Sequence, residues 1–394
     1  MTAGSAPRGR RGGGDDDALV VAFVTTLLIS IVLVVVMPSG GPGALPAPPS
    51  APDRVPAGPV IATVPPNCAI SPGTVGRLVA EPRLTKQTLT ECQWTSGGGG
   101  ASRRSLYVGI GLHHGTGGAL ANVVQPGRSP IGAAMMSFGA RWSGSSLHAV
   151  TGLGDEAIVR YSPSDGSTVV ARIGNATVVV TYLDTRRPMP EDTARNGAFT
   201  AASEVVDRLG ARSPSRPAVA PAADPSPARE TPDVCDAVSE RTLNRLVRDD
   251  REFRRARPEE AGLVVRGARG VGCSWTSQEQ RLRVAAVVVS GNALWDGTRL
   301  AARAYTIGHN DARAEETLSV RDEKIFHSVP DLGDQAFTVH VPGVLPGTVV
   351  FRDGDLLVQA SYGEVDERHP MGGGDAVRGA YAAARDVAEA LASH

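Results

Sequence analysis

Several residue types that often mark a function are scarce in this 394-residue chain. Aromatic residues make up 4% of the sequence, and only Lys86 and Lys324 among its 40 basic residues are lysines. The formal net charge is -1 at pH 7, so nothing indicates nucleic acid or another acidic polymer as a partner. The sequence also lacks phosphate-binding glycine loops, the G-x-S-x-G nucleophile turn and the H-E-x-x-H zinc motif. We therefore expect no enzymatic activity and no cofactor.

Cysteine is scarce as well, and its placement is informative. The chain has four cysteines, two in each half at corresponding places. They are Cys68, Cys92, Cys235 and Cys273. Even numbers in paired positions predict one disulfide in each half, Cys68–Cys92 and Cys235–Cys273. A zinc site built from all four is the alternative, although neither pair has the C-x-x-C spacing of such sites.

The second cysteine of each pair begins a signature that occurs twice. Residues 92–96 read CQWTS and residues 273–277 read CSWTS. Further along, residues 153–157 (LGDEA) correspond to residues 332–336 (LGDQA). Such an ordered recurrence indicates that one module has been duplicated in tandem.

The duplication extends through the next part of each half and defines the domains. Residues 168–182 align with residues 348–362 without a gap, and they share Thr-Val-Val, an arginine, a glycine and a tyrosine. We place the first module at 67–210 and the second at 233–394, and call them repeat one and repeat two. A Pro/Ala-rich linker at 211–232 separates them.

One long apolar run precedes the repeats. Residues 18–37 contain no charge, and a helix of that length spans about 30 Å, enough to cross a bilayer. Three arginines precede the run, and the next basic residue is Arg54. This asymmetry places the tail at 1–17 in the cytoplasm and the rest outside. A cleaved signal peptide is the alternative, but the run exceeds the usual apolar core of such peptides.

We therefore predict a single-pass protein of the cell membrane with its bulk outside the cell. Residues 38–66 are rich in Pro and Gly without hydrophobic periodicity, so they predict an extended spacer.

The same elements are expected in both repeats. Ser71-Pro72 and Ser239 predict N-caps of a short helix in each repeat. The other expected elements, repeat one first, are strands at 105–113 and 281–290, middle helices at 131–139 and 298–307, hairpins at 168–173/176–182 and 348–352/356–362, and closing helices at 194–209 and 376–391. Helices around antiparallel strands predict an α+β fold with the sheet covered on one face.

Taken together, the Pro-rich linker, paired cysteines, C-x-W, L-G-D-x-A and late hairpin resemble an actinobacterial extracytoplasmic family. Its members are small lipoproteins of unknown function, and a related fold forms the extracellular sensor domains of mycobacterial serine/threonine kinases. The resemblance implies a binding or sensing role outside the membrane, without catalytic residues to transfer. This chain departs from the family in having no lipid-attachment cysteine near the apolar run and no kinase domain.

The tryptophan of each signature is the first candidate site residue. Trp94 and Trp275 follow a cysteine by two positions, on the same face of a strand. The structural interpretation is that each indole packs against the disulfide, and the functional one is that it offers a stacking platform for a ligand.

The L-G-D motif and the hairpin arginines are the remaining repeated candidates. They are Gly154, Asp155, Gly333, Asp334, Arg172 and Arg352. The aspartates are expected to fix a turn through backbone hydrogen bonds. The arginines, just before the hairpin turn, are expected to be exposed and solvated, with a small anion-binding patch as the weaker alternative.

Three other features are interpreted structurally. His113-His114 would point to opposite faces of a strand and could not easily chelate one metal ion. The run at 251–257 has mixed charge and predicts a surface loop. Asn175-Ala176-Thr177 matches the glycosylation sequon, which is a poor indicator in a sequence of this composition.

Two functions remain open at this point. One is an anchored binding protein that recognises a small molecule or a cell-envelope component, in a cleft within or between the repeats. The other is a structural protein whose repeats dock onto another membrane or envelope protein.

Overall fold

The computed structural model describes most of the two repeats. The described residues are Leu45, Pro48 and the ranges 59–97, 102–114, 129–141, 147–211, 215–223, 229–248, 251–265, 268–318, 325–342, 345–365 and 371–393. The span predicted at 18–37 and the tail at 1–17 lie outside them. Within these ranges, no helix combines the length and the apolar character needed to cross a membrane.

Each repeat forms one antiparallel sheet. The strands of the first sheet are β1 (Pro82–Gln87), β2 (Glu91–Ser96), β3 (Arg104–Leu112), β4 (Leu147–Thr151), β5 (Glu156–Ser162), β6 (Gly166–Ile173), β7 (Ala176–Asp184) and β8 (Ala218–Val219). Those of the second are β9 (Glu252–Ala256), β10 (Arg269–Thr276), β11 (Gln280–Val288), β12 (Ile325–Val329), β13 (Gln335–Val341), β14 (Leu345–Asp353) and β15 (Leu356–Glu364).

The strand order confirms the duplication. The first sheet runs β1-β2-β3-β7-β6-β5-β4-β8, and the second, read from its other edge, runs β9-β10-β11-β15-β14-β13-β12. Seven strands therefore correspond one to one. The eighth, β8, comes from the segment predicted as a linker and pairs with β4 (Val150 with Val219), so part of that segment belongs to the first sheet.

The two predicted hairpins form with two-residue turns. Ile173 pairs with Ala176 in repeat one, and Asp353 pairs with Leu356 in repeat two. Gly174 and Gly354 take the first turn position with φ values of 51° and 58°, which favour glycine over residues with a Cβ. Asp353, expected within the turn, ends β14 instead.

Helices lie at corresponding places in the repeats. Repeat one has the 3-10 helix η1 (Pro66–Ala69) and the helices α2 (Pro72–Leu78), α3 (Pro130–Gly139) and α4 (Glu191–Arg208). Repeat two has α5 (Val234–Ala237), α6 (Glu240–Leu246), α7 (Gly297–Leu318) and α8 (Gly373–Ala392). Ser71 and Ser239 cap α2 and α6 by accepting from the amides of Thr74 and Thr242, as predicted.

The middle helix of repeat two is longer than predicted. The sequence after Ile307 reads Gly-His-Asn-Asp, and these residues are weak helix formers. The helix nevertheless continues to Leu318. His309, Asn310 and Asp311 are all buried, so tertiary packing overrides the local preference.

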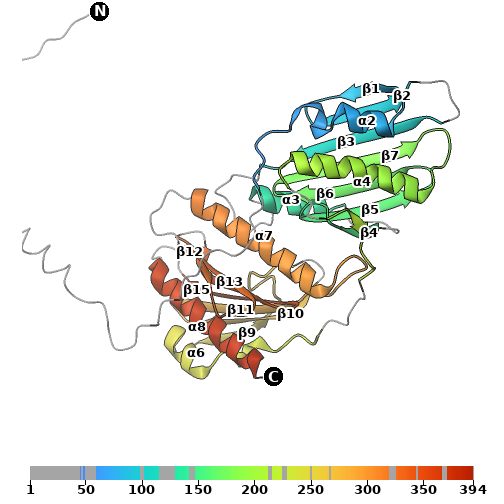
Figure 1. Ribbon diagram of the computed structural model, residues 1–394. Coiled ribbons are helices and arrows are strands. Elements are labelled where there is room, and N and C mark those ends of the chain that lie inside the picture. Colours follow the sequence, from blue (N-terminus) through green and yellow to red (C-terminus); the bar gives the residue numbers. More distant parts are fainter. Residues whose placement is uncertain are drawn as a thin grey trace, which may run out of the picture. The chain divides into compact units, whose positions relative to one another are not determined.

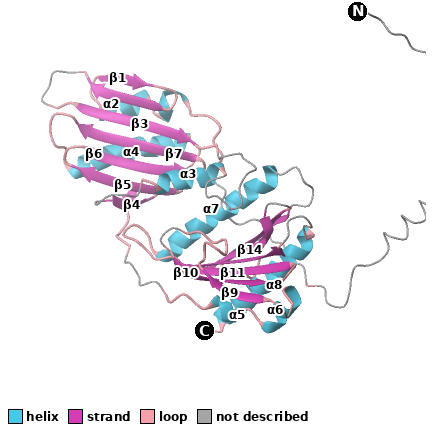
Figure 2. Ribbon diagram, turned by 180° about the vertical axis from the view of Figure 1, so that it is seen from behind, coloured by secondary structure: helices cyan, strands magenta, loops and turns pink. Residues whose placement is uncertain are grey.

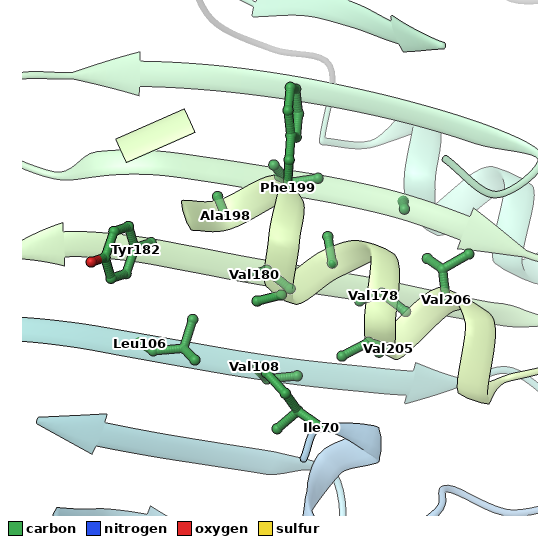
Figure 3. Packing of buried hydrophobic residues seen from close by; sticks show 14 of the residues in the cluster. Ile70, Leu106, Val108, Val178, Val180, Tyr182, Ala198, Phe199, Val205 and Val206 are labelled. Carbon is green, nitrogen blue, oxygen red and sulfur yellow. The ribbon is translucent and has the colours of Figure 1, made fainter. Parts of the chain in front are cut away.

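Both faces of each sheet carry a helix, whereas one covered face was predicted. In repeat one, Val178 and Val180 of β7 belong to the core cluster that contains residues of α4 (Figure 3). Val179, on the other face of the same strand, packs against the cluster that contains Phe138 of α3. Figure 1 shows α4 in front of the first sheet, and Figure 2, from behind, shows the strands in front of α2 and α4. Burial on both faces explains why this strand lacks apolar-polar alternation.

Sequence reasoning missed the edge strands. All six residues of β1 are exposed, so the strand shows no alternation to detect. The run at 251–257, predicted as a loop, contains the edge strand β9, which is also largely exposed. Charged residues on an exposed edge discourage pairing with other chains, and here they concealed the strand.

The predicted disulfides are confirmed. Cys68 and Cys92 are joined with a Cα–Cα distance of 6.0 Å, and Cys235 and Cys273 with 5.6 Å. Each bond ties the short helix that precedes α2 or α6, namely η1 or α5, to β2 or β10. Because all four sulfurs are used in these bonds, none is a thiolate ligand for zinc.

Residues Pro46–His394 form one compact unit rather than two, and helices α3 and α7 are in contact. Asp311 of α7 accepts hydrogen bonds from both the amide and the hydroxyl of Ser129, the N-cap of α3, each at 2.8 Å. The rings of Phe138 and Trp295 lie 6.2 Å apart between centroids. The repeats therefore share a packed contact, which argues against a freely hinged pair.

Candidate binding site

The L-G-D motif and the hairpin arginine meet in repeat one. Arg172 donates to Asp155 at 2.9 Å, to Glu156 at 3.0 Å and to the carbonyl of Gly174 at 3.0 Å. Asp155 also accepts the amide of Gly174 at 2.7 Å. The aspartate thus fixes a turn through a backbone hydrogen bond, as predicted. The turn it fixes is the β6–β7 hairpin turn at Gly174, not the turn that contains Asp155 itself. Gly154 allows this approach, because a Cβ there would lie 2.5 Å from the carbonyl of Arg172.

Repeat two contains the same network. Arg352 donates to Gln335 at 3.0 Å and to the carbonyl of Gly354 at 2.8 Å, and it pairs with Asp334 at 2.9 Å. Gly333 approaches the carbonyl of Arg352 as closely as Gly154 approaches its counterpart. Recurrence in both copies marks the network as part of the fold.

The prediction that these arginines are exposed and solvated is wrong. The residue Arg172 is only 7% exposed, and the side chain of Arg352 is 11% exposed. Their donors are directed at carboxylate, amide and carbonyl oxygens of the same repeat. Neither guanidinium is therefore placed to bind an external anion.

One position of this network differs between the copies. Glu156 uses its second oxygen to accept from Arg303 of α7 at 3.0 Å, whereas the corresponding residue in repeat two is the uncharged Gln335. Burial lowers the pKa of Arg303, and the Glu156 carboxylate acts in the opposite direction. The extra carboxylate in repeat one is thus matched by an arginine supplied by repeat two.

The signature tryptophans occupy equivalent strand positions but different surroundings. Trp94 pairs with Leu84 of β1, and Trp275 pairs with Phe253 of β9. Trp275 is 3% exposed and lies 5.5 Å from the Phe253 ring between centroids. Trp94 is only half-buried. Trp275 is thus a core indole packed on Phe253, whereas Trp94 is not fully in the core; packing of either indole against its disulfide stays a prediction.

Beside Trp94 the surface opens into what we call the edge cavity, of about 200 Å³. It lies between α2 and the β1–β2 edge. Its lining residues are Asn67, Ile70, Pro72, Val75, Pro82, Leu84, Gln87, Cys92 and Trp94. None of them is charged, and the Asn67 and Gln87 amides are the only side-chain polar groups other than the indole N–H. A bulge between Leu84 and Lys86 interrupts β1 here, and bulges bend the strand that carries them.

In repeat two, ion pairs link the corresponding strand and the residue before it to α6 and to the N-cap of α5. Arg251 bonds Glu240 and also Asn244 of α6, the latter at 2.7 Å. Arg255 pairs with Asp233 at 2.6 Å. The strand register aligns Arg251 with a proline of repeat one. The shared N-cap serine aligns Glu240 with a second proline.

Those prolines are Pro82 and Pro72 of repeat one, and both line the edge cavity. Proline has no side-chain hydrogen-bonding group and cannot link strand to helix as the ion pair does. The strand β9 also pairs without the bulge of β1. The two substitutions and the bulge account together for the gap in repeat one.

The lining indicates what the edge cavity can hold. An indole face and aliphatic groups favour an aromatic or aliphatic ligand group, and the two amides can orient one polar atom. Pockets for whole drug-sized ligands usually measure about 300–1,000 Å³, so this cavity suits a small molecule or one end of a larger one. No acid-base pair lines it.

The other candidates have structural roles. His113 accepts or donates a hydrogen bond with Thr177 at 3.1 Å, and burial lowers its pKa. The described residues contain no group of three potential metal-binding side chains. Asn175 of the sequon is 1% exposed and bonds the backbone of Ile61 and His113, so its amide is not accessible for glycosylation.

Comparisons with protein-family models, curated proteins and solved structures found no match to this chain. The edge cavity must therefore be interpreted from its own chemistry.

Proposed function

We propose that this protein is an anchored extracytoplasmic binding protein without catalytic activity, and that repeat one binds an uncharged aromatic or aliphatic group in the edge cavity. The observation that carries the proposal is the contrast around the signature tryptophan. Repeat two buries Trp275 beneath Phe253 and fixes the strand with ion pairs. Repeat one leaves Trp94 half-buried beside an open apolar cavity.

The anchor and the ligand source follow from the sequence. The apolar run at 18–37 would hold the protein in the cell membrane with both repeats outside, and the disulfides suit that compartment. A small molecule or a cell-envelope component with an apolar end is the ligand class. We place the ligand within repeat one rather than in a cleft between the repeats, because α3 and α7 are in contact there.

Native mass spectrometry of the full chain in mild detergent tests the proposal. We expect an additional mass that is retained in the native protein and lost on denaturation. The double variant Pro72→Glu/Pro82→Arg would install the repeat-two ion pair and should abolish that mass. Phe253→Ala in repeat two is the matched control and should leave it unchanged. Retention of the mass by the double variant would contradict binding in the edge cavity.

Membrane anchoring has its own test. Alkaline extraction of membranes should leave the full chain in the pellet, whereas a chain cleaved after residue 37 would be released.

A further inference from the structure

Three arginines gather on one face of the second sheet, where β9, β10 and β11 lie side by side (Figure 2). The strand register places Arg254 of β9 and Arg283 of β11 on either side of Ser274 of β10. Arg281 comes two residues before Arg283, so both side chains leave the same face of β11. Ala285 of that face belongs to the core cluster that contains residues of α7. We call Arg254, Arg281 and Arg283 the arginine cluster.

Two members of the arginine cluster have no partner of opposite charge. Arg254 pairs with Glu260 at 3.1 Å, and Glu260 also pairs with Arg257. Among the residues that the structure describes, neither Arg281 nor Arg283 forms a hydrogen bond or an ion pair. Both side chains are nevertheless half-buried. The cluster therefore holds guanidinium donors that face no acceptor of the chain itself.

The three cationic groups also lie close enough to repel one another. Burial lowers the pKa of Arg283, and the charges of Arg281 and Arg254 lower it further. Like charges on neighbouring strands destabilise a sheet. An anion between the guanidinium groups would remove this repulsion and accept their hydrogen bonds.

Hydroxyl groups border the arginine cluster on both sides of β11. Arg283 pairs with Ser274 of β10 and with Ser361 of β15, and directly opposed residues share one face of a sheet. The two serines are 9% and 6% exposed. The Ser361 hydroxyl accepts from Gln359 at 3.3 Å, and the Ser274 hydroxyl lies 3.5 Å from that of Thr276. Serine hydroxyls of this kind can donate to an anion beside the arginines.

In repeat one, a carboxylate of the chain itself lies at this place. Gln93 corresponds to Ser274 by the signature, and its neighbours across the sheet are Lys86 and Tyr107. Glu91 accepts from Tyr107 at 2.9 Å and pairs with Lys86 at 2.5 Å. The hydrogen bonds from Lys86 and Tyr107 lower the pKa of Glu91. Repeat one thus supplies the anion for its own donors.

Repeat two keeps the donors and lacks the carboxylate. Arg254 and Arg283 stand where repeat one has lysine and tyrosine, and Gly272 stands where it has glutamate. A Cβ at Gly272 would lie 2.8 Å from the carbonyl oxygen of Arg257, so this position has no room for an acidic side chain. The anion that the arginine cluster calls for must therefore come from outside the chain.

We propose that the arginine cluster of repeat two binds a phosphate group of an external ligand. Guanidinium groups bind phosphate through paired hydrogen bonds. Glu260 is the only carboxylate that pairs with the cluster in the described part of the chain. A phosphate monoester carries a charge of about −1.5 to −2 and so compensates the two remaining arginines better than a carboxylate does.

This site is separate from the edge cavity. It lies in the other repeat, and Ser274 points to the face opposite that of its neighbour Trp275. Binding of phosphate to repeat two and binding of an apolar group to repeat one are therefore independent, and failure of one leaves the other standing.

Isothermal titration calorimetry of the full chain in a non-ionic detergent tests the proposal. Inorganic phosphate is the probe, and chloride holds the ionic strength constant because salt screens exposed charges. We expect saturable binding with a Kd at or below about 1 mM. Arg283→Gln should weaken it at least about tenfold, since the charge-assisted hydrogen bonds are lost. Arg245→Gln removes the same charge from the exposed last turn of α6 and, as the matched control, should leave the affinity unchanged.

Thermal unfolding without phosphate separates lost binding from lost structure. Arg283→Gln relieves the repulsion and should unfold at the same temperature as the unaltered chain or higher. Arg281→Gln is the second variant and should weaken phosphate binding in the same way.

Two soluble probes distinguish the sources of the phosphate group. Tighter binding of glycerol phosphate, a monoester, would support a phosphorylated solute as the ligand. Tighter binding of glycerophosphoglycerol, a diester, would support the headgroup of a membrane lipid. Absence of saturable phosphate binding up to about 20 mM, or an equal loss of affinity in Arg245→Gln, would overturn the proposal.

Discussion

The two repeats share one topology but differ around the signature tryptophan and its edge strand. Repeat one has an open edge cavity beside Trp94, which is only half-buried. Repeat two buries Trp275 against Phe253 and has the ion pairs Arg251–Glu240 and Arg255–Asp233 at this edge. Side chains at a few positions of the sheet edge therefore decide how far the signature indole is exposed.

The parts that do not differ show what the fold requires. Tyr182 and Tyr362 donate to the carbonyls of Leu78 and Leu246 at 2.8 and 2.9 Å, and each ring lies against a helix glycine. Ser71 and Ser239 donate to Glu204 and Asp386 of the closing helix at the same register.

The shared features join strand, cap and closing helix, whereas the differences lie at the sheet edge. Duplication has thus preserved the core while the sheet edge diverged.

The largest effect expected on stability comes from the two tryptophans. Trp275→Ala removes a fully buried indole packed on Phe253 and should lower the free energy of unfolding by about 3–5 kcal/mol. Trp94→Ala removes a half-buried one and should cost about 1–2 kcal/mol. Urea unfolding of the two variants measures the difference. Equal losses would mean that the two indoles are equally buried.

A comparable effect on stability is expected from the hairpin arginines. Arg172→Met leaves the Asp155 and Glu156 carboxylates without their shared partner and should cost about 3–5 kcal/mol. Arg352→Met leaves a single, more exposed carboxylate and should cost about 1–2 kcal/mol. Thermal unfolding under the same conditions compares the two variants, and a larger loss for Arg352→Met would contradict the difference drawn between the networks.

A smaller effect is expected where the networks differ in charge. Glu156→Gln removes the charge of the carboxylate that accepts from the buried Arg303 at 3.0 Å and should cost about 1–3 kcal/mol. Gln335→Glu introduces into repeat two the glutamate that repeat one has at this position. Its carboxylate can still accept from Arg352, as Gln335 does, so stability should change by about 0.5 kcal/mol at most. Chemical unfolding of the single variants and of the double variant checks the two values. A neutral Glu156→Gln would mean that Arg303 does not depend on this carboxylate.

The smallest effect is a pH dependence at the end of β7. Burial raises the pKa of Asp184, but hydrogen bonds from Ser102 and from the amides of Arg186, Arg103 and Arg187 outweigh it and lower the pKa to about 2. A lowered pKa means that the carboxylate stabilises the fold above its unfolded value of about 3.9 and that this contribution is lost as the pH falls through about 2.

Asp184→Asn should therefore cost about 1–2 kcal/mol at pH 7 and progressively less between pH 4 and pH 2. Denaturant titrations across that range test this, and a cost independent of pH would show that the ionised form makes no special contribution. Glu364 holds the same position in repeat two, and Glu364→Gln provides the comparison.

The sequence was sufficient to predict the elements with a strong local signal. The Ser-Pro cap at Ser71, the Gly174 turn and the paired cysteines all have fixed chemistry, and the structure has them where predicted. Edge strands carry no such signal, because every residue of β1 is exposed. The extension of α7 beyond Ile307 depends on contacts of Asp311 with a residue 182 positions away, which local propensity cannot indicate.

The candidate sites could be predicted only in part. The repeated motif indicates Trp94, but its difference from Trp275 depends on Pro72 and Pro82, which both line the cavity. Nothing in the sequence brings those two positions together before the strand β1 is known. The repeated hairpin likewise indicates Arg172, yet its carboxylate partners Asp155 and Glu156 come from the turn before β5 and from the start of that strand, which the hairpin alone does not reveal.

The central claim is that repeat one is open where repeat two is closed, and fluorine NMR of the full chain tests it most directly. Incorporated 5-fluorotryptophan, assigned by Trp→Phe variants, would be titrated with indole as a small aromatic probe. The account predicts that the Trp94 resonance shifts in a saturable manner while the Trp275 resonance does not move. A shift at Trp275, or the absence of any shift at Trp94, would contradict it.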